Sequence, residues 1–151
     1  MSGPDVALLE GVVELLAAEV DPIWSLNWST VGAYSTDVTG IYVFLVPPSP
    51  NRIVTLSSYG LGDDATYSDT TTGLQVRTRS VDQDPRDAID LDAAIADVLL
   101  GRYPFDLPTG VHIQTAQRTS GPTSLGQDDN LRWEFSSNYS LGLHRPGTHR
   151  L

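Results

Sequence analysis

Apolar residues near the start of the chain recur at the three- and four-residue spacing of one helical stripe. The stripe consists of Val6, Leu9, Val13, Leu16 and Val20, and Leu8, Val12 and Leu15 widen it. The pair Asp21-Pro22 follows, and proline cannot continue a helix. The pattern therefore predicts an amphipathic helix over residues 6–20.

A second helix is indicated by the segment DQDPRDAIDLDAAIADVLLGR, which begins at residue 82. Asp84 suits the N-cap, Pro85 the first helical position and Asp87 the acidic first turn. Gly101 is placed to end the helix. We expect Ile89, Ala93, Ile95, Val98 and Leu99 to form the buried side, and Asp90, Asp92 and Asp97 the solvent-facing side.

Two short runs of β-branched and aromatic residues, Gly40–Pro48 and Asn51–Gly60, are separated by prolines. They predict a pair of strands buried on both faces. The segment Ile23–Trp28 has a weaker strand pattern.

Later strands alternate between apolar and polar positions. In Thr72–Val81, one face carries Leu74, Val76 and Thr78, and the other carries Gln75, Arg77 and Arg79. Two further strands, Val111–Arg118 and Leu131–Leu143, are joined by a turn-rich segment, TSGPTSLGQDDN. In the last strand, Arg132, Glu134 and Asn138 share one face, and Trp133, Phe135 and Tyr139 share the other.

This order of elements predicts an α+β fold, with both helices packed on one mixed or antiparallel sheet. A length of 151 residues and 40% hydrophobic residues are enough for one domain with a sizeable core. We expect this domain to span residues 1–151, with an extended tail over residues 144–151.

Composition excludes several classes of protein. The absence of cysteine excludes disulfides, thiolate metal sites and cysteine nucleophiles. The net charge is −10 and all nine basic residues are arginine, so the chain lacks the basic surface that general nucleic-acid binding needs. No apolar run approaches the length of a membrane span, and the first residues lack a signal-peptide pattern. We therefore expect a protein made and kept in a cytosol, or in something assembled there.

No catalytic, cofactor or metal site is predicted. Asp63, Asp64 and Asp69 lack the ligand spacing of a calcium loop, and His112, His144 and His149 are too scattered for a local metal motif. Ser124 lies in no nucleophile elbow, and the Gly60–Gly62 stretch lacks the lysine and the context of a phosphate loop. The acidic segment that follows Gly60 is interpreted as a loop that is solvated or ordered by a partner.

The polar strand faces allow two interpretations. The face that carries Arg77, Arg79, Arg132 and Glu134 is either a solvent-exposed sheet surface or a subunit interface. Such residues are costly to bury without partners, and arginine suits interfaces because its planar fork pairs bidentately with carboxylates. The residues alone leave both readings open.

Three longer stretches together resemble the tail terminator family of tailed phages, also known as minor capsid proteins in phages of actinobacterial hosts. They are TGIYVFLVPPSPNRIVTLSSYG, TTGLQVRTRSVDQDPR and SLGQDDNLRWEFSSNYSLGLHRP. The resemblance runs from about Leu9 to Arg150. It combines a proline-rich strand link, a Gln-Val-Arg-x-Arg strand, Asp-Pro-Arg at the second helix, and an ending with Arg-Trp-Glu and Asn-Tyr.

The resemblance implies a structural protein without catalysis or cofactor. It would form a homo-oligomeric ring, usually of six, at the tail–neck junction of the virion. The ring would cap the tail tube, stop tube growth and dock to the head, with assembly in the bacterial cytoplasm. Its partners would be the tail tube protein and a head–tail connector or stopper, and DNA would pass through without specific binding.

Two sets of residues are then expected to make contacts. Gln75, Arg77, Arg79, Arg132, Glu134 and Asn138 would support subunit contacts or the polar face of the sheet. Because long loops in compact domains are usually functional or mobile, Asp63, Asp64, Tyr67 and Asp69 would contact a neighbouring subunit or the tube. The alternatives are a head–tail connector, a tail-tube subunit and, from another class, a small hydrolase or sugar-binding module.

Overall fold

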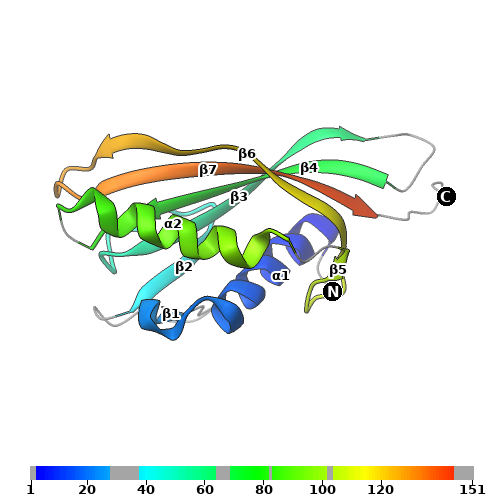
Figure 1. Cartoon of the computed structure of the whole chain (residues 1–151), viewed down its shortest axis with the longest axis horizontal. Coiled ribbons are helices and arrows are strands. Elements are labelled where there is room, and N and C mark those ends of the chain that lie inside the picture. Colours follow the sequence, from blue (N-terminus) through cyan, green and yellow to red (C-terminus); the bar gives the residue numbers. More distant parts are fainter. Residues whose placement is uncertain (1–2, 28–37, 64–68, 82, 102–103, 145–151) are drawn as a thin grey trace.

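The computed structural model of this chain describes residues 3–27, 38–63, 69–81, 83–101 and 104–144. Over these residues a twisted sheet carries two helices on one face (Figure 1). In chain order the elements are α1 (Pro4–Glu19), a 3₁₀ turn (Pro22–Trp24), β1 (Leu26–Asn27), β2 (Thr39–Val43), β3 (Ile53–Asp63), β4 (Asp69–Arg79), α2 (Pro85–Leu99), β5 (Phe105–Asp106), β6 (His112–Gln127) and β7 (Trp133–His144). The predicted α+β fold is confirmed.

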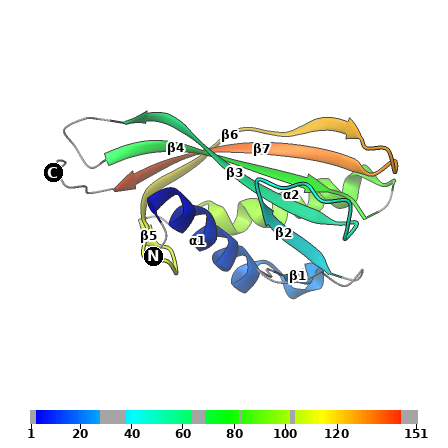
Figure 2. The same ribbon diagram turned by 180° about the vertical axis from the view of Figure 1, so that it is seen from behind.

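The sheet is mixed. Its strand order is β1-β2-β3-β4-β7-β6-β5, in which β1, β2 and β3 run parallel and all other neighbours run antiparallel. Figure 2, the view from behind, shows the β3–β4 hairpin and the β6–β7 turn at opposite ends of the long axis. The four long strands β3, β4, β7 and β6 therefore form the body of the sheet.

The first predicted helix is confirmed as α1, with Pro4 in its first turn. Leu8, Val12 and Leu16 are fully buried against the sheet, whereas Val6 is exposed. The apolar stripe of α1 is thus buried from Leu8 onwards, and its first residue, Val6, lies outside the core.

The second helix begins as predicted. Asp84 is the N-cap and its side chain accepts a hydrogen bond from the Arg86 backbone N–H. Asp87 also binds another segment, because Arg52 donates to both of its carboxylate oxygens at 3.0 and 2.6 Å. This ion pair ties the start of β3 to the first turn of α2.

The predicted buried side of α2 is partly wrong. Ile89 and Ala93 are exposed, and Asp92, which we placed on the solvent-facing side, is buried. The buried stripe instead runs through Ala88, Leu91, Asp92, Ile95, Ala96, Val98 and Leu99. Asp92 lies within this stripe, so the helix presents a carboxylate to the sheet.

The first strand pair is present and its strands are parallel, but β2 is shorter than predicted. β2 ends at Val43 because Phe44 adopts a left-handed backbone conformation, with φ of 60°, and the chain turns back there. The predicted strand residues Phe44, Leu45 and Val46 are consequently exposed. The return segment, residues 44–52, is shorter than the dozen or more residues that usually connect parallel strands.

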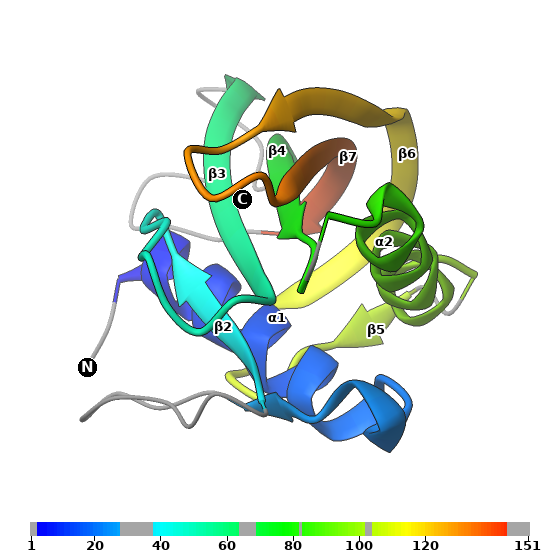
Figure 3. The same ribbon diagram turned by 90° about the vertical axis from the view of Figure 1, so that its left-hand side faces the viewer.

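The two long hairpins contain more strand than predicted. β3 and β4 continue into the acidic segment after Gly60, and β6 extends to Gln127 through the segment predicted as a loop. β6 follows β7 with four register shifts between Ile113 and Gly126, so its path is irregular. Viewed end-on, the sheet is strongly twisted and β6 arches over β7 (Figure 3).

The hydrophobic core lies between the helices and one face of the sheet. Its sheet side is built from alternate residues, including Val54, Leu56, Leu74, Val76 and Tyr139. Thr78 belongs to the same face, because its hydroxyl donates to the Ala88 carbonyl of α2. The intervening residues therefore lie on the face away from the helices. Among the described residues, no helix is long and apolar enough to span a membrane.

Candidate functional site

A cluster of charged side chains lies on the helix-free face at the end of the sheet where β6 turns into β7. We call it the arginine cluster, and it consists of Arg77, Arg79, Arg132, Asp128 and Glu134. β4 and β7 place its members next to one another, because Arg79 is the register partner of Glu134. The return segment 44–52 passes over it.

Arg79 is a buried cation that is held by three backbone carbonyls. It is 2% exposed, and its guanidinium donates to the carbonyl oxygens of Asn51, Pro47 and Pro50 at 2.8, 2.7 and 2.7 Å. Burial, together with the charge of Arg132, lowers the pKa of Arg79 from its ordinary value to about 10. The side chain thus stays charged at neutral pH and holds the return segment against the sheet.

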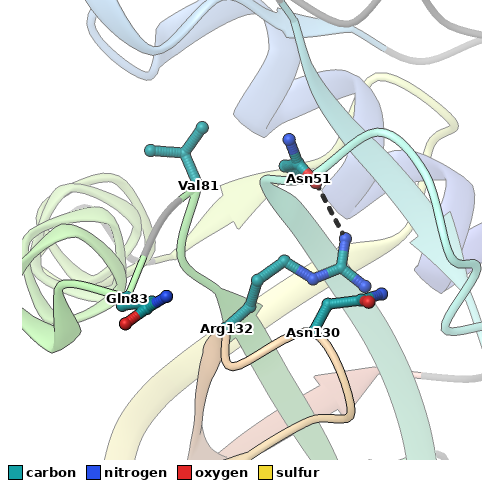
Figure 4. Close-up of a pocket in the computed structure, with 5 residues that line it drawn as sticks. All are labelled: Asn51, Val81, Gln83, Asn130 and Arg132. Carbon is teal, nitrogen blue, oxygen red and sulfur yellow. Dashed lines mark hydrogen bonds between the residues drawn. The ribbon is translucent and has the colours of Figure 1, made fainter.

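Arg132 holds the same segment from the β6–β7 turn. It donates to the Pro48 carbonyl at 2.8 Å and to the Asn51 side chain at 3.0 Å, the bond drawn in Figure 4. Its Nε and its second terminal nitrogen lie 2.9 and 2.8 Å from Oδ2 of Asp128. Burial alone would raise the pKa of Asp128, but hydrogen bonds from Arg132 and Asn130 lower it overall.

Arg77 pairs with Glu134 at 2.9 Å, and this pair is the more accessible part of the cluster. The Arg77 side chain is 34% exposed, and its Nε is buried without a hydrogen-bond partner. Farther along the same face, Asn138 accepts a hydrogen bond from the Tyr59 hydroxyl and donates to Ser120. Gln75 is half-buried opposite Asn138.

The structure thus brings the six predicted contact residues onto one face, in two groups. Arg79, Arg132 and Glu134 are buried, whereas Gln75, Arg77 and Asn138 are half-buried. Whether any of them also contacts a second subunit stays a prediction.

The contacts of the arginine cluster favour a structural role, in which it holds two segments of the chain together. An open pocket of about 460 Å³ beside it is lined by Asn51, Val81, Gln83, Asn130 and Arg132 (Figure 4). The only charged group in that lining, Arg132, is already bound to Asp128. The cluster can therefore fix the return segment and the β6–β7 turn relative to each other.

Asp63 and Asp69, the described residues of the predicted contact loop, lie at the opposite end of the sheet. Asp63 ends β3, and Asp69 begins β4, where its carboxylate accepts from Gln114 at 3.2 Å and lies 3.1 Å from His144. Asp64 and Tyr67 lie outside the described residues.

A second polar cluster was missed by the sequence reasoning. Buried Asp92 of α2 accepts a hydrogen bond from Ser137 at 2.7 Å, and its other oxygen lies 3.6 Å from Arg118 of β6. The Arg118 guanidinium stands 5.9 Å from the centre of the Tyr139 ring. Burial raises the pKa of Asp92. Its position between Leu91 and Ile95 of the apolar stripe was the signal that could have revealed this burial.

The described residues include no group of three His, Asp or Glu side chains placed to hold a metal ion. The His–Asp contacts they contain are two pairs at the β3–β4 end of the sheet, His112 with Asp106 and His144 with Asp69.

Comparisons with known proteins agree with the sequence resemblance. The family described as "Bacteriophage tail terminator protein" matches residues 26–144, which is most of the chain. No curated protein matches the sequence.

Among solved structures, a chain from the "Virion of native gene transfer agent (GTA) particle" has a similar fold. Its TM-score is 0.68 at 16% sequence identity, over 95% of this chain and 99% of that one. A second solved chain has a TM-score of 0.48 at 12% identity, over 90% and 91% of the two chains, and is too distant to support an argument. At these identities the likeness concerns the fold.

Proposed function

Because the chain belongs to the bacteriophage tail terminator protein family, a family of structural tail proteins, we propose that it forms a ring that caps the finished tail tube. The ring ends tube polymerisation and offers the surface to which the head docks. The observation that carries this proposal is the family match over residues 26–144, which contains every described strand and α2.

The proposed ring contains six copies at the tail–neck junction and assembles in the host cytoplasm. Its partners are the tail tube protein on one side and a connector or stopper protein on the other. It performs no catalysis and lets DNA pass without specific binding. The arginine cluster supports this role, because its ion pairs and carbonyl contacts use charge to hold segments of the chain together.

Within the ring, the half-buried residues Gln75, Arg77 and Asn138 support the subunit contacts or the polar face of the sheet. Buried Arg79 and Arg132 assist by fixing the return segment, and buried Glu134 by pairing with Arg77. The hairpin end that contains Asp63 and Asp69 contacts a neighbouring subunit or the tube.

Deleting the gene from a phage that carries this protein tests the proposal. We expect tails of uncontrolled length that do not join heads, because nothing covers the growing end of the tube. Tail length and head attachment are measured by electron microscopy, and supplying the wild-type protein in trans is the control. Absent tails would instead indicate a tube subunit, and tails of normal length that join heads would refute the terminator role.

A further inference from the structure

Two strand edges of the sheet are open in the described part of the chain. β2 pairs with β3 only as far as Leu56, whose carbonyl accepts from the Phe44 N–H at 2.9 Å. On the other side of the sheet, β5 pairs with β6 only at His112 and Ile113. Among the described segments, none pairs with the outer side of β3 over residues 57–63, or of β6 over residues 114–127. Such rows of free main-chain N–H and C=O groups are templates for pairing with another chain.

The two open edges lie at the same level of the sheet. Tyr59 of β3 is opposite Gly73, Gly73 is opposite Ser140, and Ser140 is opposite Gln117 of β6. These three strand pairings are all antiparallel, so β3 and β6 run in opposite directions. If β6 of a second copy lies beside β3 without a change of level, the new pair is antiparallel as well.

The β3 edge is built as a contact surface. Its residues Tyr59 and Leu61 are 41% and 51% exposed, and its open stretch contains no proline, a residue that commonly protects an edge. An adjoining groove of about 380 Å³ lies between this edge and the N-terminal turns of α1, and is lined in part by Val6, Leu9 and Phe44. Figure 2 shows α1 and β3 side by side along this surface.

Charge favours contact between the two different edges over contact between two copies of the same one. Asp5 lines the groove beside the β3 edge, so a contact between two β3 edges would bring two acidic groups together. By contrast, residues 114–127 contain one arginine and no acid, in a chain with 19 acidic residues. A contact between unlike surfaces is heterologous, and heterologous contacts build rings.

We propose that the open edge of β3 in one copy pairs with the open edge of β6 in the next copy, so that β3, β4, β7 and β6 of successive copies form a continuous antiparallel sheet around the ring. The contact is centred on residues 58–60 and 116–118, because β3 has a register shift between Gly60 and Gly62 and β6 has one between Ile113 and Thr115. Beyond Arg118, Pro122 and three register shifts make β6 a poor partner for a regular ladder. This proposal rests on the ring of the proposed function and names the surfaces that build it.

Cysteine cross-linking tests the contact, because the natural chain has no cysteine and every thiol is therefore an introduced one. The double variant Leu61→Cys with Gln117→Cys is supplied to a phage that lacks the gene. Assembled tails are treated with a short bismaleimide and separated by denaturing electrophoresis. Both side chains are exposed, and within one copy they lie three strand spacings apart, about 14 Å. We expect a ladder of covalent multimers that continues past the dimer.

Matched variants make the result specific. Each single variant should stay monomeric, and so should Ile23→Cys with Gln117→Cys, because Ile23 is 80% exposed but lies away from the β3 edge. Dimers from Leu61→Cys alone would overturn the proposal in favour of a contact between two β3 edges. Links to a different virion protein, or functional tails in which the double variant gives no ladder, would overturn it as well. The gene deletion tests the terminator role separately, so a failed cross-link leaves that role standing.

Discussion

Arg79 and Arg132 are buried cations that hold backbone carbonyls of a segment distant in the sequence. A lysine could not replace them, because its ammonium lacks the planar fork that reaches several acceptors at once. Their partners, the carbonyls of Pro47, Pro48 and Pro50, belong to residues without an N–H, so this part of the return segment depends on contacts from outside.

We predict that Arg79→Ala lowers the free energy of unfolding by roughly 3 kcal/mol, since it leaves three carbonyls, the buried one of Pro50 among them, without this donor. Urea denaturation followed by tryptophan fluorescence measures the change. The exposed arginine of α2 supplies the control, because Arg86→Ala should leave stability close to wild type. Equal stability of the two variants would mean that the return segment does not need Arg79.

The second residue-scale prediction concerns Asp92 and pH. Because burial raises the pKa of Asp92, the folded state binds its proton more tightly than the unfolded state. Its contribution to stability is therefore complete below the ordinary aspartate pKa of 3.8 and is lost as pH rises through the raised value. The loss amounts to about 1.4 kcal/mol for each unit of the shift.

Asp92→Asn removes this titration and keeps the shape of the side chain. We expect wild type to lose stability relative to Asp92→Asn between pH 4 and pH 7, as measured by urea denaturation at both pH values. The opposite trend would show that the ion pair with Arg118 outweighs burial.

At the scale of elements, Gly121 of β6 lies at a point where β6 closely approaches β7. Gly121 has a φ of 105°, and a Cβ there would lie 2.6 Å from the Ser136 carbonyl oxygen and from the Ser137 Cα. Gly126, in the same strand, has a φ of 86° but nothing within 4 Å of a Cβ. Substitutions at these two positions therefore distinguish the cost of backbone strain, which both share, from the cost of steric overlap, which only Gly121 has.

Gly121→Ala is predicted to cost on the order of 3 kcal/mol, through both strain and overlap with backbone atoms that cannot move easily. Gly126→Ala should cost about 1 kcal/mol, through strain alone. Thermal unfolding of the two variants checks the difference. If both variants lose the same stability, β7 must shift to make room for the added Cβ at position 121.

At the scale of the whole molecule, the arginines bind groups of the same chain and the net charge is acidic. In the described part of the chain, six arginines bind groups of their own chain: Arg52 with Asp87, Arg77 with Glu134, Arg86 with Asp84, Arg118 with Asp92, Arg132 with Asp128, and Arg79 with backbone carbonyls. Six copies of a chain with net charge −10 would carry −60 formal charges around the tail axis. The excess charge of the proposed ring is therefore acidic.

We predict that acidic residues, rather than arginines, line the bore of the ring. Like charge lets DNA slide, and screening limits its reach to about 8 Å at physiological salt. An electron-microscopy map of the virion neck, in which this chain can be placed, decides the point. A bore lined mainly by arginine would contradict the sliding argument and leave the cap function intact.

Local signals in the sequence were enough to determine the α+β class and the beginning of α2. Asp84-Pro85 caps the helix through contacts within one turn, and the alternation of Leu74, Val76 and Thr78 identifies the core face of β4 without any knowledge of its neighbours. Such signals can be recognised in the sequence alone, because helix capping and strand alternation depend only on residues close together in the chain.

Only the tertiary structure decided how the polar residues are used. Asp92 is buried because Ser137 and Arg118, both distant in sequence, meet it across the α2–sheet contact. The apolar run at Phe44–Val46 is exposed because the chain reverses there and two arginines from other strands hold the return segment. Partners for buried charges come from long-range packing, and a pattern read along one chain does not contain them.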